Sequence, residues 1–204
     1  MKTVIIDYGM GNLRSVQKAV QSLGFPAEIS AQAAVLRGAD ALILPGVGAF
    51  PQAMANLEQR KLLPELKANL HKPFLGICLG MQLLLSQSEE FGLHPGLDII
   101  AGEVKYFRKA EKFPAELPVP HMGWNDVRQR PCALFRGLPE SFSVYFVHSY
   151  YVKPKAPEVA AGITQYGLDF CSALAKDNVF GVQFHPEKSG ETGLQILRNF
   201  LSLV

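Results

Sequence analysis

Short hydrophobic runs alternate with amphipathic segments through the first half of the chain. Runs with the length and apolar composition of buried strands cover residues 4–7, 27–30, 40–44 and 72–77. The segments between them carry apolar residues at helical spacing, over residues 13–23, 31–37, 50–58 and 62–70. In the first of these, Asn12 is suited to cap the helix and Gly24 to end it. This alternation predicts an α/β fold, with a doubly wound, mostly parallel sheet covered by helices on both faces.

From Gly96 onward the pattern changes to short β-rich runs, which predict hairpins and a meander. These runs cover residues 99–104, 144–152, 159–165 and 179–184. Residues 113–120 contain three prolines and are expected to form an extended loop, while residues 192–203 have helical spacing. No internal repeat is visible. A chain of 204 residues is therefore expected to form one domain, residues 1–204, with a β-rich C-terminal half.

Composition narrows the functional classes. The chain is 48% hydrophobic and 19% charged, as expected for a globular protein, and its net charge of +2 is too small to indicate a nucleic-acid partner. No segment is long and apolar enough to predict a membrane span, and no export signal is visible. The odd number of widely spaced cysteines, Cys78, Cys132 and Cys171, fits a reducing compartment. We therefore expect a cytoplasmic protein.

The segment Gly76-Ile77-Cys78-Leu79-Gly80 places a cysteine between two glycines, where a strand gives way to a helical run over residues 81–85. This pattern is typical of a nucleophile elbow. At a helix N-terminus, unpaired backbone N–H groups and the helix dipole favour a thiolate over a thiol. A small buried cysteine in a tight turn has the same local pattern, so the elbow alone does not establish a nucleophile.

His185-Pro186-Glu187 follows the apolar run 179–184 and supplies a base together with an acceptor that can orient it. Because the ends of neighbouring strands converge at one edge of a sheet, His185 is expected to lie near Cys78. Acyl transfer also needs N–H donors for a developing oxyanion, and Leu79 and Val47 are candidates. The loop 45–48, which contains Val47, is equally compatible with a simple tight turn.

Two other kinds of site are disfavoured. Gly9-Met10-Gly11 begins like a dinucleotide-binding fingerprint, but Arg14 occupies the place of the third glycine and no suitable acid follows. The five histidines show none of the close spacings of metal ligands and have no accompanying cysteine pair. We therefore expect neither a cofactor nor a metal ion.

Three motifs together, at residues 44–50, 76–82 and 181–189, resemble the class I glutamine amidotransferases. The resemblance implies that Cys78 attacks the side-chain amide of glutamine, forms a γ-glutamyl thioester and releases ammonia. It implies that His185 is the acid and base, that Glu187 orients it, and that Val47 and Leu79 supply the oxyanion N–H groups. The glutamine-binding residues that it implies are Gly46, Gln82 and the backbone of His148, Ser149 and Tyr150.

Further motifs, at residues 7–13, 120–125 and 145–151, resemble the branch of this family that delivers ammonia to a separate (β/α)₈-barrel cyclase in histidine biosynthesis. This implies a heterodimer in which the cyclase raises a weak basal glutaminase activity. The positions that match the partner interface are Asn12, Trp124, Tyr145 and Lys188. The same four residues are also compatible with ordinary surface and core packing.

Three alternatives remain open. The anthranilate and aminodeoxychorismate synthase subunits would share the mechanism, but they usually have histidine where this chain has Met81 and a second proline in the loop that here reads Val47-Gly48. A cysteine hydrolase acting on peptides or γ-glutamyl substrates is a second possibility. A catalytically silent interaction module that keeps the elbow only as structure is the third.

Overall fold

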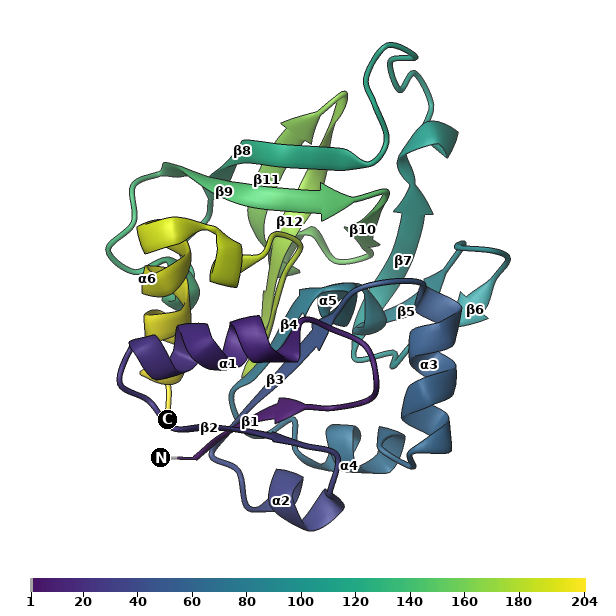
Figure 1. The fold of residues 1–204 in the computed structure, drawn as a ribbon. Helices are drawn as coiled ribbons and strands as arrows, with labels where there is room; N and C mark the ends of the chain where they lie inside the picture. The colour runs from purple at the N-terminus through teal and green to yellow at the C-terminus, as the bar shows by residue number, and fades with distance from the viewer. Residues whose placement is uncertain (1) are drawn as a thin grey trace.

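A mixed β-sheet runs through the computed structural model, which describes residues 2–204 (Figure 1). Five strands form its parallel part, in the spatial order β2 (Ala27–Ser30), β1 (Thr3–Ile6), β3 (Ala41–Gly46), β4 (Phe74–Cys78) and β13 (Val179–Val182). The sheet continues through β12 (Leu168–Lys176), β10 (Tyr150–Pro154), β7 (Ile100–Tyr106), β5 (Leu85–Ser88) and β6 (His94–Pro95). An antiparallel branch beside β12 consists of β11 (Ala160–Tyr166), β8 (His121–Gln129) and β9 (Ser141–His148).

Helices cover both faces of the parallel part, so the predicted α/β fold is confirmed. One face packs against α2 (Ala33–Arg37), α3 (Phe50–Gln59), α4 (Leu63–Ala68) and α5 (Leu79–Leu83). The other face packs against α1 (Leu13–Ser22) and α6 (Gly190–Leu201). Alternate residues of β1 and β3 point into two separate hydrophobic clusters, because side chains along a strand alternate between faces. These strands are buried on both sides, which explains their uninterrupted apolar sequences.

The structure differs from the sequence pattern mainly in the second half. The predicted run 144–152 is divided at Ser149 into β9 and β10, which pair with different neighbours. Four further strands, β5, β6, β8 and β12, lie outside the predicted runs. The residues of β8 are largely polar, and this strand exists because it pairs with β9 and β11, not because its own sequence favours burial.

Among residues 2–204, no helix combines the length and the apolar composition required to cross a lipid bilayer.

Candidate active site

The turn from β4 to α5 has the geometry of a nucleophile elbow. Cys78 ends β4 with φ +55°, a backbone conformation that is strained for a residue with a side chain. A Cβ atom on Gly80 would lie 1.8 Å from the carbonyl oxygen of Leu44, and one on Gly76 would lie 2.6 Å from that of Gly80. The flanking glycines are therefore required for the close packing that holds this strained turn. The helix that follows has only five residues, so its dipole is short.

Three neighbouring strands converge on this turn. β4 lies between β3 and β13, and all three are parallel, so their carboxyl ends meet at one edge of the sheet. β3 ends at Gly46, directly before the loop that carries Val47. β13 ends three residues before His185, which precedes the short 3₁₀ helix η4 (Pro186–Lys188). The topology thus brings together segments that are more than one hundred residues apart in the chain.

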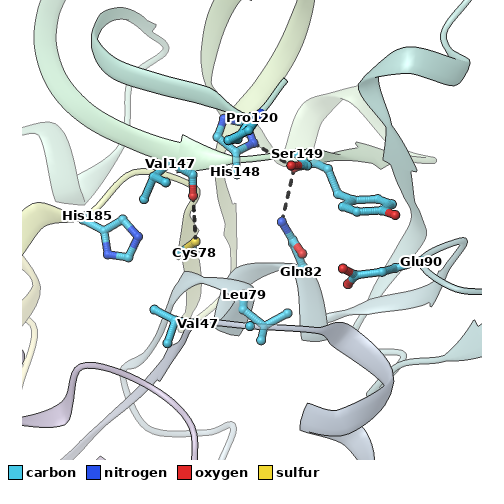
Figure 2. Close-up of a pocket in the computed structure, with 12 residues that line it drawn as sticks. Val47, Cys78, Leu79, Gln82, Glu90, Pro120, Val147, His148, Ser149 and His185 are labelled. Atoms are coloured by element: carbon cyan, nitrogen blue, oxygen red, sulfur yellow. Dashed lines mark hydrogen bonds between the residues drawn. The ribbon is translucent and has the colours of Figure 1, made fainter. Parts of the chain in front are cut away.

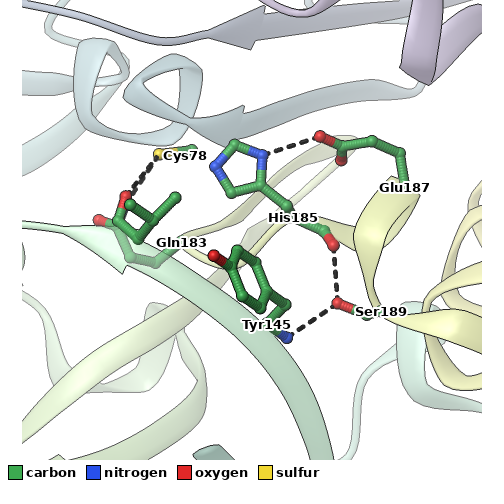
Figure 3. A network of polar contacts seen from close by, with 7 residues as sticks. Cys78, Tyr145, Gln183, His185, Glu187 and Ser189 are labelled. Carbon is green, nitrogen blue, oxygen red and sulfur yellow. Dashed lines mark hydrogen bonds and ion pairs between the residues drawn. The ribbon is translucent and has the colours of Figure 1, made fainter. Parts of the chain in front are cut away.

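His185 is fixed by hydrogen bonds on two sides (Figure 3). Its Nδ1 lies 2.8 Å from Oε1 of Glu187, and both side chains are at most 3% exposed. Its backbone N–H donates to the carbonyl oxygen of Tyr145 (2.9 Å), and its carbonyl oxygen accepts from the hydroxyl of Ser189 (2.6 Å). The same hydroxyl accepts from the backbone N–H of Tyr145 (3.0 Å). These contacts hold the imidazole against β9.

The second ring nitrogen of His185 faces the side of Cys78 (Figure 3). This Nε2 atom is buried and makes no hydrogen bond among residues 2–204. Burial alone would lower the pKa of His185, but the adjacent Cys78 sulfur and the Glu187 carboxylate raise it to about 10. The ring is therefore a proton donor at neutral pH, positioned beside a sulfur atom.

The sulfur of Cys78 has two further polar neighbours. Its thiol points to the carbonyl oxygen of Val147 at 3.9 Å, and Nε2 of Gln183 donates to Sγ at 3.6 Å. Gln183 is completely buried. Gln183 was not among the residues predicted from the sequence, although a glutamine inside the apolar run 179–184 was a signal that could have identified it.

Cys78 opens onto a cavity of about 440 Å³, large enough for a free amino acid (Figure 2). The lining residues are Val47, Gly48, Cys78, Leu79, Gln82, Glu90, Pro120, Val147, His148, Ser149, Tyr150 and His185. The cavity therefore unites most of the predicted site residues, while Glu187 lies behind His185. Gly46 is not among the lining residues; a Cβ atom there would lie 2.5 Å from Oη of Tyr8 and 2.8 Å from Cβ of Leu79.

Gln82 and Glu90 both point into this cavity (Figure 2). Nε2 of Gln82 donates to the carbonyl oxygen of Tyr150 (3.2 Å) and to Oε1 of Gln183 (3.1 Å), which leaves Oε1 of Gln82 as the atom available to a ligand. Glu90 accepts a 2.7 Å hydrogen bond from the backbone N–H of Phe50, and burial raises the pKa of its carboxyl group. Glu90 was not predicted from the sequence, where its only signal was an acidic residue shortly after the elbow helix.

Three of the four predicted interface residues are neighbours. The rings of Trp124 and Tyr145 meet edge to face at 6.4 Å, and Nζ of Lys188 lies 5.9 Å from the centre of the Tyr145 ring. Trp124 is 59% exposed, and Met122, on the same face of β8, is 62% exposed. The fourth residue, Asn12, is exposed at the start of α1, which packs against η4. This surface borders the strand that supplies Val147 to the cavity.

The chain is similar to known proteins along almost its whole length. Residues 4–204 match the family model described as glutamine amidotransferase class-I. The chain is 54% identical over 203 residues to a protein of Moorella thermoacetica named imidazole glycerol phosphate synthase subunit HisH, covering 98% of this chain and 94% of that protein. A protein of the same name from Geobacter sulfurreducens is 50% identical over 204 residues, covering 98% and 97%.

Solved structures with low sequence identity share the fold. One described as a glutamine amidotransferase has a TM-score of 0.74 at 20% identity, covering 98% of this chain and 97% of that one. Another, described as PurLQS from Thermotoga maritima, has a TM-score of 0.74 at 16% identity, covering 99% and 98%. These two similarities concern the fold alone.

Proposed function

Because the chain belongs to the class I glutamine amidotransferases, we propose that it is the glutaminase subunit of an imidazole glycerol phosphate synthase and that it hydrolyses L-glutamine in the Cys78 cavity. The relatives at 54% and 50% identity carry this subunit name and are covered almost completely. The geometry that carries the proposal is the convergence of Cys78, His185 and Glu187 at one edge of the sheet. Residues 1–204 act as one domain in this proposal, which agrees with the family match over residues 4–204.

In the first half-reaction, Sγ of Cys78 attacks as the anion, its proton held by His185, and forms a carbon–sulfur bond to the side-chain amide carbon of glutamine. Negative charge develops on the amide oxygen, and we assign its stabilisation to the backbone N–H groups of Leu79 and Val47. His185 gives its Nε2 proton to the amide nitrogen, so the carbon–nitrogen bond breaks and ammonia leaves. A γ-glutamyl thioester remains on Cys78.

In the second half-reaction, a water molecule attacks the thioester carbon. His185 removes a proton from that water, the carbon–sulfur bond breaks, and the sulfur leaves as the anion, which restores the starting pair with the proton on His185. Glutamate is released, so the sum of both steps is glutamine plus water giving glutamate plus ammonia. Glu187 takes up no proton in either step and holds the imidazole through Nδ1, which keeps Nε2 directed at the reacting atoms.

Substrate orientation follows from the polar atoms of the cavity. The carboxylate of Glu90 offers a counter-charge for the α-ammonium group of glutamine, and Oε1 of Gln82 offers an acceptor. The backbone of His148, Ser149 and Tyr150 forms the opposite wall of the cavity and is suited to bind the remaining polar groups of the amino acid. Val47 and Gly48 contribute from the β3 loop, directly after the predicted Gly46.

A partner protein completes the proposal. Ammonia released into water is soon protonated and lost as a nucleophile, so it must reach an acceptor site directly. We assign that site to a (β/α)₈ cyclase subunit that forms imidazole glycerol phosphate and the aminoimidazole carboxamide ribotide AICAR in histidine biosynthesis. The exposed Trp124, the Tyr145–Lys188 pair beside it, and Asn12 are the residues that we propose to contact the cyclase.

The decisive test compares glutamine with ammonium salts as nitrogen source for product formation by the reconstituted complex. The Cys78→Ala variant is expected to abolish the glutamine-dependent route and to leave the ammonia-dependent route intact, because only the former needs the thiol. Cys132→Ala, which alters a half-buried cysteine outside the cavity, is the matched control and is expected to keep both routes. Glutamine-dependent product formation by Cys78→Ala would contradict the proposal.

A further inference from the structure

Two buried histidines face each other above the cavity. His121 in β8 is directly opposite His148 at the end of β9, and the two are 3% and 6% exposed. Nδ1 of His121 lies 2.9 Å from Nε2 of His148, a hydrogen-bond distance. One ring must therefore donate and the other accept, since two donors or two acceptors would repel each other.

The surrounding contacts determine the direction of this hydrogen bond. Nδ1 of His148 lies 2.8 Å from the carbonyl oxygen of Tyr150, which can only accept, so Nδ1 carries the proton and Nε2 is the acceptor. Nδ1 of His121 is then the donor, and its Nε2 accepts from the side-chain amide of Asn125 at 3.1 Å. That amide also donates to the carbonyl oxygen of Gln165 at 3.0 Å. Every polar atom of both rings has a defined role.

Aromatic packing keeps the rings in this arrangement. His121 is stacked between Phe146 and Tyr166, with ring centres 4.8 Å and 4.0 Å away. Burial lowers the pKa of His121 to about 4. Burial, followed by the charges of His121 and His185, also lowers the pKa of His148, to about 3, although its hydrogen bond to Tyr150 acts in the opposite sense. Both imidazoles are therefore neutral near pH 7, as the donor and acceptor assignment requires.

The chain of hydrogen bonds ends at the glutamine-binding wall. The carbonyl oxygen of Tyr150 accepts from His148 and also from Nε2 of Gln82, whose amide holds Gln183. In a region packed with aromatic side chains, two buried polar rings are costly unless their hydrogen bonds are used. Here those bonds lead to the peptide segment that lines the cavity.

We propose that His121 and His148 form a positioning relay that fixes the Tyr150 carbonyl and, through it, Gln82 in the orientation that binds glutamine. The inference rests on the proposed function, since it assigns Gln82 and the Tyr150 segment to substrate binding. His121 is not among the residues that line the cavity, so it acts only through His148. The relay positions the Tyr150 segment and Gln82 in the same way in the substrate complex and in the transition state. Its loss is therefore expected to raise KM more than it lowers kcat.

The primary test is His121→Phe, which keeps a flat ring between Phe146 and Tyr166 but removes the donor to His148. With the cyclase present, KM for glutamine is expected to rise about 10-fold while kcat stays within about 2-fold, because the substitution leaves the buried acceptor Nε2 of His148 unpaired. His121→Asn retains a donor near the position of Nδ1 and is expected to restore part of the affinity. His71→Phe, at an exposed histidine away from the cavity, is the control and is expected to leave KM unchanged.

The outcomes separate the relay from the proposed function. If the wild-type complex does not hydrolyse glutamine, the proposed function is wrong, whatever His121 does. If the wild type is active and His121→Phe keeps its KM, or loses kcat and stability at constant KM, the relay is wrong. Should His121→Phe fail to fold, Asn125→Ala removes the outer donor from a half-buried position and is expected to raise KM about 2-fold; an unchanged KM there would overturn the relay.

A measurement on the wild type tests the relay independently of variants. Nitrogen-15 chemical shifts of the histidine rings are expected to show both His121 and His148 as neutral rings with the proton on Nδ1 at pH 7. A charged ring, or a proton on Nε2 of His148, would contradict the direction of the chain.

Discussion

The parallel strands and the antiparallel branch contribute different properties to the same cavity. β3, β4 and β13 lead into the proposed reacting groups, and they lie in an apolar layer in which glycines allow backbone atoms to approach closely. β8 and β9 supply the opposite wall, and their interior is a network of hydrogen-bonded polar rings. The contrast shows that a strained nucleophile needs tight backbone packing, whereas orientation of a small polar substrate needs fixed hydrogen-bond directions.

The largest effect is expected from a substitution that disrupts the packing of the parallel region. Gly80→Ala would place a methyl group 1.8 Å from the Leu44 carbonyl oxygen, so the backbone of the elbow must move. We expect a loss of about 3 kcal/mol in the free energy of unfolding, measured by urea denaturation, with loss of glutamine hydrolysis. Gly38→Ala is the matched control, because a methyl group there meets no atom closer than 3.5 Å. Equal stability of the two variants would show that the elbow tolerates displacement.

A smaller effect is expected from removing the negative charge beside His185. Glu187→Gln keeps the size of the side chain but removes the carboxylate that helps to raise the pKa of His185. Glutamine-dependent turnover is expected to fall about 100-fold, and the alkaline limb of its pH profile should move to lower pH, because His185 then loses its proton earlier. The exchange Glu191→Gln, on the first turn of α6, serves as control. An unshifted alkaline limb would show that Glu187 does not raise the pKa of His185.

The smallest effect concerns the pH dependence of the antiparallel branch. Because the folded-state pKa values of His121 and His148 lie below the unfolded value, only the unfolded chain takes up these protons as the pH falls below about 6.5. Their contribution to stability is therefore full above pH 6.5 and decreases toward pH 4. Between pH 7 and pH 5, His121→Phe should lose less unfolding free energy than the wild type, by about 1 to 2 kcal/mol. Parallel stability curves for the two proteins would contradict this interpretation.

Local pattern was sufficient to locate Cys78, His185 and Glu187 as candidates. The glycines around Cys78, the run that leads to His185, and the spacing between His185 and Glu187 are all readable over a few residues, because each depends on the conformation of one short segment. The alternation of strands and helices over the first half was readable for the same reason, since buried parallel strands have continuous apolar sequences.

Tertiary structure decided what surrounds these three residues. Gln183 reaches the sulfur of a residue 105 positions away, and Glu90 reaches the cavity by bonding to the start of a helix 40 positions earlier. His121 and His148 lie opposite each other because of the register in which β8 and β9 pair. β8 has too few apolar residues to be recognised as a strand from its own sequence. Sequence periodicity reports burial along one segment, but the pairing of distant segments is selected by the whole packed core, so Gln183, Glu90 and the contact between His121 and His148 became visible only in three dimensions.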